Sequence, residues 1–212
     1  MKAFGYSVIR LFSYSVILMI TACTNHDTVI EGTLPGDQYD SETVYWVPYK
    51  GASAATVDSA RINNDVFRIV ISARNQNKMG IIRVKHQLRK ALQEILVYTE
   101  AGTVQVKLDS ISSASGTSLN EVLQNWKDRK RIYDKEIYDL RRELKNADTD
   151  ENTGIQEKID NVSAVYYNDV FEIFLENKDN DVGEFIFSLH QSGFTPEQIQ
   201  ESESYLQAAR AR

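Results

Sequence analysis

The chain has 212 residues, of which 42% are hydrophobic and 25% charged, as in ordinary globular proteins. Lys2 and Arg10 lie in a segment that we expect to be removed, so 22 basic residues face 30 acidic ones and the net charge is −8. This balance disfavours nucleic-acid binding. The single cysteine, Cys23, excludes a disulfide within the chain, a Cys-x-x-Cys redox pair and a cysteine-rich zinc site.

Residues 1–22 have the pattern of a lipoprotein signal peptide. Residues 1–10 carry two positive charges and no acid, and residues 11–20 form an apolar run of typical signal-peptide length. This run is too short to span a bilayer, which takes about 20 apolar residues. Residues 20–23 then read Ile-Thr-Ala-Cys. They resemble the bacterial lipobox, in which the cysteine receives lipid before cleavage.

We therefore expect Cys23 to be lipidated and residues 23–27 to form a lipidated tether. Three acyl chains on one cysteine would hold the protein on a membrane, because each buried CH₂ contributes about 0.8 kcal/mol. Residues 24–27 read Thr-Asn-His-Asp, without the acidic run that resembles the surface-export signals of Bacteroidetes lipoproteins. The sequence predicts a lipid anchor in the envelope, at the outer membrane facing the periplasm, with surface exposure as the open alternative.

Residues 28–112 are predicted to form a β-rich domain. Short runs rich in β-branched and aromatic residues alternate with turn residues; they lie at 28–34, 42–48, 55–62, 66–71, 79–84, 95–99 and 103–108. Between the third and fourth runs, residues 63–65 read Asn-Asn-Asp, which favours a tight hairpin. Seven short strands at this spacing predict an antiparallel β-sandwich or a strongly curved sheet.

Residues 117–210 are predicted to be helical. Ser118 and Glu121 have the spacing of a capping box at a helix start. Apolar residues then recur at steps of three and four, first over 118–147 and again over 154–177. We expect these two stretches to pack as a long antiparallel helical hairpin, followed by short helices at 181–191 and 196–208. The expected fold class is α+β.

The two predicted hairpin helices differ in charge. The first carries a basic run over residues 127–131 and further basic residues beyond it, whereas the second carries acidic residues such as Asp160 and Asp169. Pairing across the hairpin is the simplest explanation of this difference, and it makes a nucleic-acid partner unnecessary.

Two acidic segments invite a calcium interpretation, at residues 148–154 and 177–183. Neither has the glycine at position 6 or the glutamate at position 12 of an EF-hand loop, so we expect turns and helix caps and no metal. Glu172 and Glu176 lie one helical turn apart, and on such a helix they are expected to face solvent rather than to catalyse. With no catalytic motif recognised, the sequence predicts a protein that is not an enzyme and has no cofactor.

The order of these parts is similar to a known family. The lipobox, the β-rich segment, the Ser-Gly-Thr-Ser-Leu-Asn stretch at 115–120 and the Thr-Pro-Glu stretch at 195–197 resemble the domain of unknown function 4369 of Bacteroidetes lipoproteins. The resemblance covers roughly residues 28–206. In that family a thioredoxin-like thiol-disulfide oxidoreductase domain of the AhpC/TSA type usually follows. Here the chain has no Cys-x-x-Cys, so we expect that chemistry to be absent from these residues.

A Bacteroidetes origin would also give meaning to three short Asp-Ser/Thr-aliphatic motifs. They resemble O-glycosylation acceptors of those bacteria and place the acceptor oxygen on Thr28, Ser59 and Ser110. Turn or strand-end use of the aspartates explains the last two motifs equally well.

Three functions remain open at this stage. The first is a non-enzymatic, lipid-anchored envelope protein that binds or positions a partner protein. The second is an accessory domain acting with a thioredoxin-like protein on a separate chain. The third is a glycan-binding lipoprotein, which would use the aromatic residues Tyr45, Trp46 and Tyr49.

Overall fold

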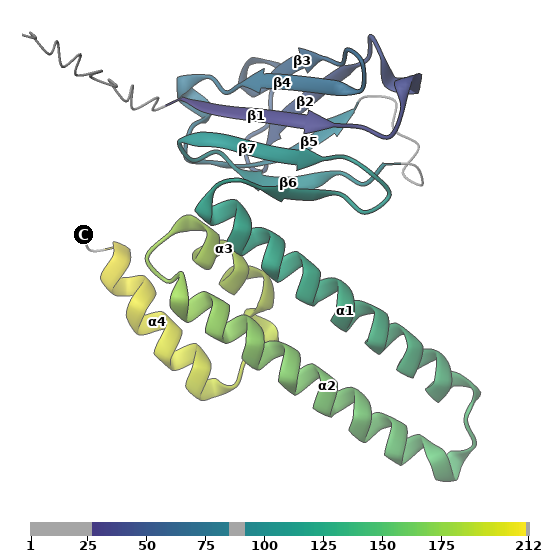
Figure 1. Ribbon diagram of the computed structural model, residues 1–212. Coiled ribbons are helices and arrows are strands. Elements are labelled where there is room, and N and C mark those ends of the chain that lie inside the picture. Colours follow the sequence, from purple (N-terminus) through teal and green to yellow (C-terminus); the bar gives the residue numbers. More distant parts are fainter. Residues whose placement is uncertain (1–26, 85–91, 211–212) are drawn as a thin grey trace, which may run out of the picture.

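The computed structural model describes residues 27–84 and 92–210. Cys23 and the rest of the predicted signal peptide and tether up to residue 26 therefore lie outside the described residues. Within the described residues the N-terminal part forms a β-sandwich and the C-terminal part is helical, which confirms the α+β prediction (Figure 1).

The sandwich consists of two four-stranded sheets within the described residues. The first sheet has the order β4-β1-β7-β8 and the second the order β3-β2-β5-β6. The strands are β1 (Thr28–Thr33), β2 (Thr43–Pro48), β3 (Asp58–Arg61), β4 (Val66–Val70), β5 (Met79–Val84), β6 (Ile95–Tyr98), β7 (Gly102–Lys107) and β8 (Ser113–Ser115). The last strand was not predicted, and it carries the sandwich beyond the expected end at residue 112.

The first sheet is mixed rather than purely antiparallel. β1 and β7 run parallel, with Thr28 opposite Gly102 and Thr33 opposite Lys107, whereas the other strand pairs are antiparallel. Parallel neighbours need a long crossover connection. Here the chain between β1 and β7 supplies it by passing through the second sheet.

The turn at residues 63–65 forms and is closed by an antiparallel bridge between Asn63 and Val66, but the predicted hairpin ends at that bridge. Asn64 and Asp65 adopt left-handed angles, with φ of 50° and 61°. The flanking strands then part, because β3 pairs with β2 in one sheet and β4 pairs with β1 in the other. Both strands direct apolar side chains into the space between the two sheets. They can do so because the chain crosses from one sheet to the other at this turn.

Trp46 fills the centre of the sandwich core. Its side chain is fully buried, and its indole ring lies against Gly80, where an added Cβ would be 2.1 Å from the ring. Trp46 therefore cannot belong to an exposed aromatic platform. Alternation along β2 explains the error, since residue 46 points inward while residues 45 and 47 point outward.

The helices are α1 (Ser118–Asn146), α2 (Thr149–Glu176), α3 (Asp181–His190) and α4 (Pro196–Arg210). The apolar stripes of α1 and α2 face each other as predicted: Ile137 of α1 packs with Ile155 and Ile159 of α2. The turn between these helices is shorter than expected, and Gly154 lies inside α2. Acidic residues after Asp148 favour this early start, because they suit the positive end of a helix.

The start of α1 differs from the predicted capping box. Thr117 is the N-cap residue, without a side-chain cap hydrogen bond. The backbone N–H of Leu119 instead donates to Glu100 Oε1 at 2.6 Å, from the loop between β6 and β7. The helix is therefore capped by the sandwich, a contact between distant residues that the local sequence does not show.

The hairpin of α1 and α2 extends from the sandwich, and α3 and α4 pack near its base (Figure 1). In the described part of the chain, no helix is both long and apolar enough to cross a membrane.

Candidate functional site: the cleft between the sandwich and α3

The outer face of the second sheet forms the base of this site. Tyr98 of β6 belongs to the same apolar cluster as Leu123 and Trp126 of α1 and Ile186 of α3. Buried Asn120 ties α1 to the sheet, because its side chain accepts from the Tyr98 backbone N–H at 2.9 Å and donates to the Tyr98 carbonyl at 2.7 Å. The Asn120 side chain therefore pairs with the β6 backbone as a neighbouring strand would, and this holds the start of α1 against β6.

Tyr98 also links the sheet to α3 through its side chain. The Tyr98 hydroxyl donates to Asp181 Oδ2 at 2.9 Å. Burial, reinforced by this hydrogen bond, raises the pKa of Tyr98 well above its ordinary value. The phenol therefore stays neutral and acts as a donor throughout the physiological pH range.

His190 fixes the other end of α3. Its Nδ1 lies 2.9 Å from the Ile186 carbonyl, and its Nε2 lies 2.9 Å from the Tyr166 hydroxyl. A carbonyl can only accept, so Nδ1 carries the proton and Nε2 accepts from Tyr166. Burial lowers the pKa of His190. The neutral imidazole therefore joins α3 to α2.

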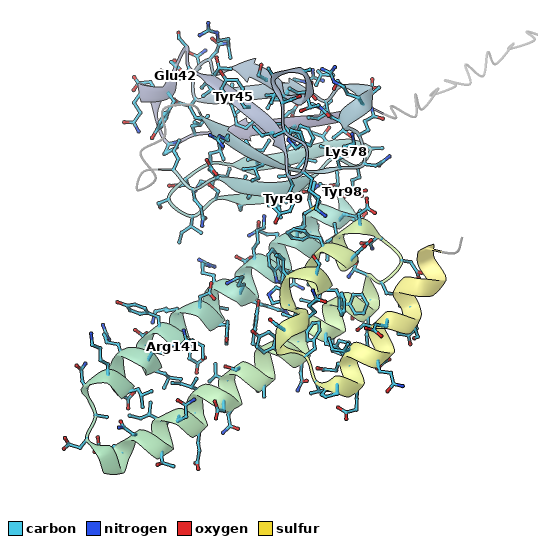
Figure 2. All side chains as sticks on the ribbon, turned by 180° about the vertical axis from the view of Figure 1, so that it is seen from behind. Glu42, Tyr45, Tyr49, Lys78, Tyr98 and Arg141 are labelled. Atoms are coloured by element: carbon cyan, nitrogen blue, oxygen red, sulfur yellow. The ribbon has the colours of Figure 1, made fainter. Side chains whose placement is uncertain are left out.

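Between these fixed elements lies a cleft of about 540 Å³. Tyr49, which directly follows β2, is 43% exposed, and its ring meets the Phe185 ring edge-on at 5.3 Å. Tyr49, Lys78 and Tyr98 lie on the side of the sandwich that meets the helices (Figure 2). The walls come from the end of β2, the loop before β5 and one face of α3; they include Lys50, Asn75, Asn77, Lys78, Asp181, Glu184 and Ser188.

The chemistry of this lining favours binding. It combines an exposed aromatic ring with two lysines, two acidic residues and two side-chain amides. None of the lining residues is a histidine or a cysteine. Such a surface can bury an apolar side chain of a ligand and pair charges of both signs around it.

The structure separates the three predicted glycosylation acceptors. Thr28 is fully buried, and its hydroxyl donates to the Thr99 and Glu100 carbonyls. A transferase could therefore reach this hydroxyl only before the domain folds, and glycosylation of Thr28 stays a prediction. Ser59 and Ser110 are exposed on the sandwich surface.

The acidic segments serve as turns and caps where the structure describes them. Asn180 caps α3 by accepting from the Val182 and Gly183 backbone N–H groups, and Asp148 precedes α2. Within residues 27–84 and 92–210, no cluster of three or more His, Cys, Asp or Glu side chains could hold a metal ion. Glu172 and Glu176 are both exposed on α2.

The basic run is paired mainly within α1. Lys130 bonds to Asp134 and Arg131 to Asp128, whereas Arg129 bonds across the hairpin to Asp169 at 2.9 Å. The basic residues of this run are therefore paired mostly with acidic residues of α1 itself, and pairing across the hairpin explains the predicted charge difference only in part. Lys127 is different, because it is partly buried and donates to the Leu96 carbonyl at 3.3 Å. Burial lowers its pKa to about 8.

The residues that shape the cleft were largely absent from the sequence-based predictions. Tyr98 and Asp181 were expected only as parts of a strand and of a helix start, and Tyr49 was grouped with Tyr45, which is not among the residues that line the cleft. Tyr98 and Asp181 are 83 residues apart, so no local pattern could reveal their contact.

The fold defines an α+β protein in which a β-sandwich supports a helical hairpin. Residues 28–123 match the model of a family described as Domain of unknown function (DUF4369). The match takes in the described strands and the first residues of α1 but ends well before residue 206, where the expected resemblance ended. No curated protein and no solved structure gives a significant match to the chain.

Proposed function

We propose that this protein is a lipid-anchored protein of the bacterial envelope that binds and positions a partner protein, without catalysing a reaction itself. The cleft between the sandwich and α3 is the observation that carries the proposal. Its exposed Tyr49 ring provides the kind of amphipathic anchor that dominates protein interfaces. The lipobox at Cys23 supports the anchor.

The lining favours a polypeptide over a glycan as the ligand. Lys50 and Lys78 can pair with acidic side chains of a partner, and Asp181 offers an acceptor for basic ones. The glycan alternative depended on Trp46, whose ring is buried in the core. A polypeptide segment inserted beside Tyr49 would use both the aromatic ring and the surrounding charges.

The alternative partner is a thioredoxin-like protein on a separate chain. This version of the proposal is supported by the family model that residues 28–123 match, together with the expectation that thioredoxin-like domains accompany that family. It makes the cleft the accessory surface of a thiol-disulfide system rather than a site of redox chemistry.

The test places a photo-crosslinking amino acid at Ser188, an exposed position on the cleft wall, in the full-length protein in its native cells. We expect a protein adduct after illumination. The Tyr49→Ala substitution should lower its yield at least about tenfold, since loss of an aromatic hot spot typically costs 2 kcal/mol or more.

Tyr138→Ala is the matched control, because Tyr138 is also an exposed tyrosine but lies on α1 outside the cleft. It should leave the adduct unchanged. Absence of any protein adduct at Ser188, or equal loss in both variants, would contradict the proposal. Mass spectrometry of the adduct decides whether the partner is thioredoxin-like.

A further inference from the structure

A second hollow lies on the hairpin, away from the cleft. This groove has a volume of about 420 Å³ and is lined by residues of α1 and α2 alone. Ile132 of α1 and Val165 of α2 border it, and each is 64% exposed. Tyr133 and Tyr166 also line the groove, with their rings stacked at 4.1 Å. Two branched aliphatic side chains thus face solvent over a rigid aromatic pair.

Arg129 and Glu136 are the charged residues of α1 that line the groove, and Arg129 is paired across it. At one end Arg129 of α1 bonds to Asp169 of α2 at 2.9 Å, and both side chains remain partly exposed. The stacking of Tyr133 on Tyr166 places Ile132 and Val165 at one level along the hairpin. These two levels of the groove therefore each offer one residue from α1 and a matching one from α2.

The two helices also differ in total charge. α1 contains eight basic and six acidic residues, whereas α2 contains one basic and seven acidic residues. A surface built from one slightly positive and one strongly negative helix can complement itself when a second identical surface is turned so that unlike helices meet.

We propose that this groove binds the same groove of a second copy of the chain, about a two-fold axis parallel to the hairpin. In this arrangement α1 of each copy lies on α2 of the other, and the two hairpins form a four-helix bundle. Ile132 meets Val165 of the second copy, and Arg129 meets Asp169 of the second copy. The alternative two-fold arrangement places α2 on α2 and opposes two strongly acidic helices. This pairing is separate from the cleft and leaves the proposed function independent of it.

The experiment uses charge variants of the full-length protein, co-expressed with two different affinity tags and co-purified in detergent. Copies of the natural sequence should co-purify. When both copies carry Arg129→Asp, two acidic residues meet at each contact between positions 129 and 169. When both carry Asp169→Arg, two basic residues meet there. In each case the amount of co-purified protein should fall at least about tenfold. Arg129→Asp paired with Asp169→Arg restores both contacts and should recover co-purification.

Recovery in the mixed pair shows at the same time that both variants fold. Failure of the natural copies to co-purify would overturn the proposal, as would full co-purification of either variant with itself. A mixed pair that stays apart would exclude the α1-on-α2 arrangement. None of these outcomes alters the adduct expected at Ser188, so the two proposals fail separately.

Discussion

Two glycines show how burial decides the effect of one added methyl group. The Gly80→Ala substitution places a Cβ 2.1 Å from the Trp46 ring in the sandwich core. We expect it to lower the free energy of unfolding by about 1–3 kcal/mol, as overpacking typically does. Gly154 lies in α2 with no atom within 4 Å of the added Cβ, so Gly154→Ala should instead stabilise the protein by about 0.5–1 kcal/mol. Urea unfolding of both variants checks the two signs; a stable Gly80→Ala variant would contradict the packing.

Lys127 gives the stability of the protein a pH dependence. Burial lowers its pKa to about 8 in the folded state, whereas the pKa of a lysine in the unfolded chain is about 10.4. Between these values the unfolded state binds more protons, so the contribution of Lys127 to stability rises with pH. Below pH 8 the folded state carries the full cost of burying the charge.

We expect Lys127→Met to be more stable than the natural protein at pH 7.5. This advantage should shrink by about 1–2 kcal/mol as the pH rises to 10. Denaturant unfolding at a series of pH values measures it. Lys145→Met, at an exposed position of α1, is the control and should show no such trend. A pH-independent difference for Lys127→Met would show that this ammonium is not buried.

At the scale of elements, Asn120 determines how α1 sits on the sandwich. Its buried side chain bonds to both backbone groups of Tyr98. Asn120→Ala leaves that N–H and carbonyl without their partner, and we expect a loss of about 1–3 kcal/mol in the free energy of unfolding. Amide exchange of Tyr98 should accelerate at the same time. Asn125→Ala, on the exposed surface of α1, should change neither quantity; an equal effect of the two substitutions would argue against the role of Asn120.

The elements differed in how well local sequence predicted them. Both hairpin helices were predicted because apolar residues at steps of three and four fix the buried face of a helix without reference to the rest of the chain. The positions of β1 to β7 were also predicted, but β8 and the pairing of the strands were not. β3 and β4 are neighbours in sequence and lie in different sheets, whereas β1 and β7 are distant and pair in parallel.

At the scale of the whole molecule, the proposed lipid anchor at Cys23 would place the cleft and the groove at a membrane surface. Cys23→Ala should keep the protein from being lipidated, so that it leaves the detergent phase in phase partitioning or accumulates as an uncleaved precursor. Ser59→Ala is the control and should partition as the natural protein does. Unchanged partitioning and processing of Cys23→Ala would contradict the lipobox. The intact mass of the natural product, compared with residues 23–212 carrying three acyl chains, provides an independent check.

The sequence by itself determined the α+β class and the hairpin helices, because both depend on residues close together in the chain. The lipid anchor at Cys23 stays a prediction from the sequence. Only the tertiary structure decided that Trp46 is core, that Thr28 is buried and that Tyr98 meets Asp181. Strand alternation indicates that half of the residues face inward, but not which half until the sheets pair. The cleft is built from β2, β5 and α3, so it exists only once distant segments have packed.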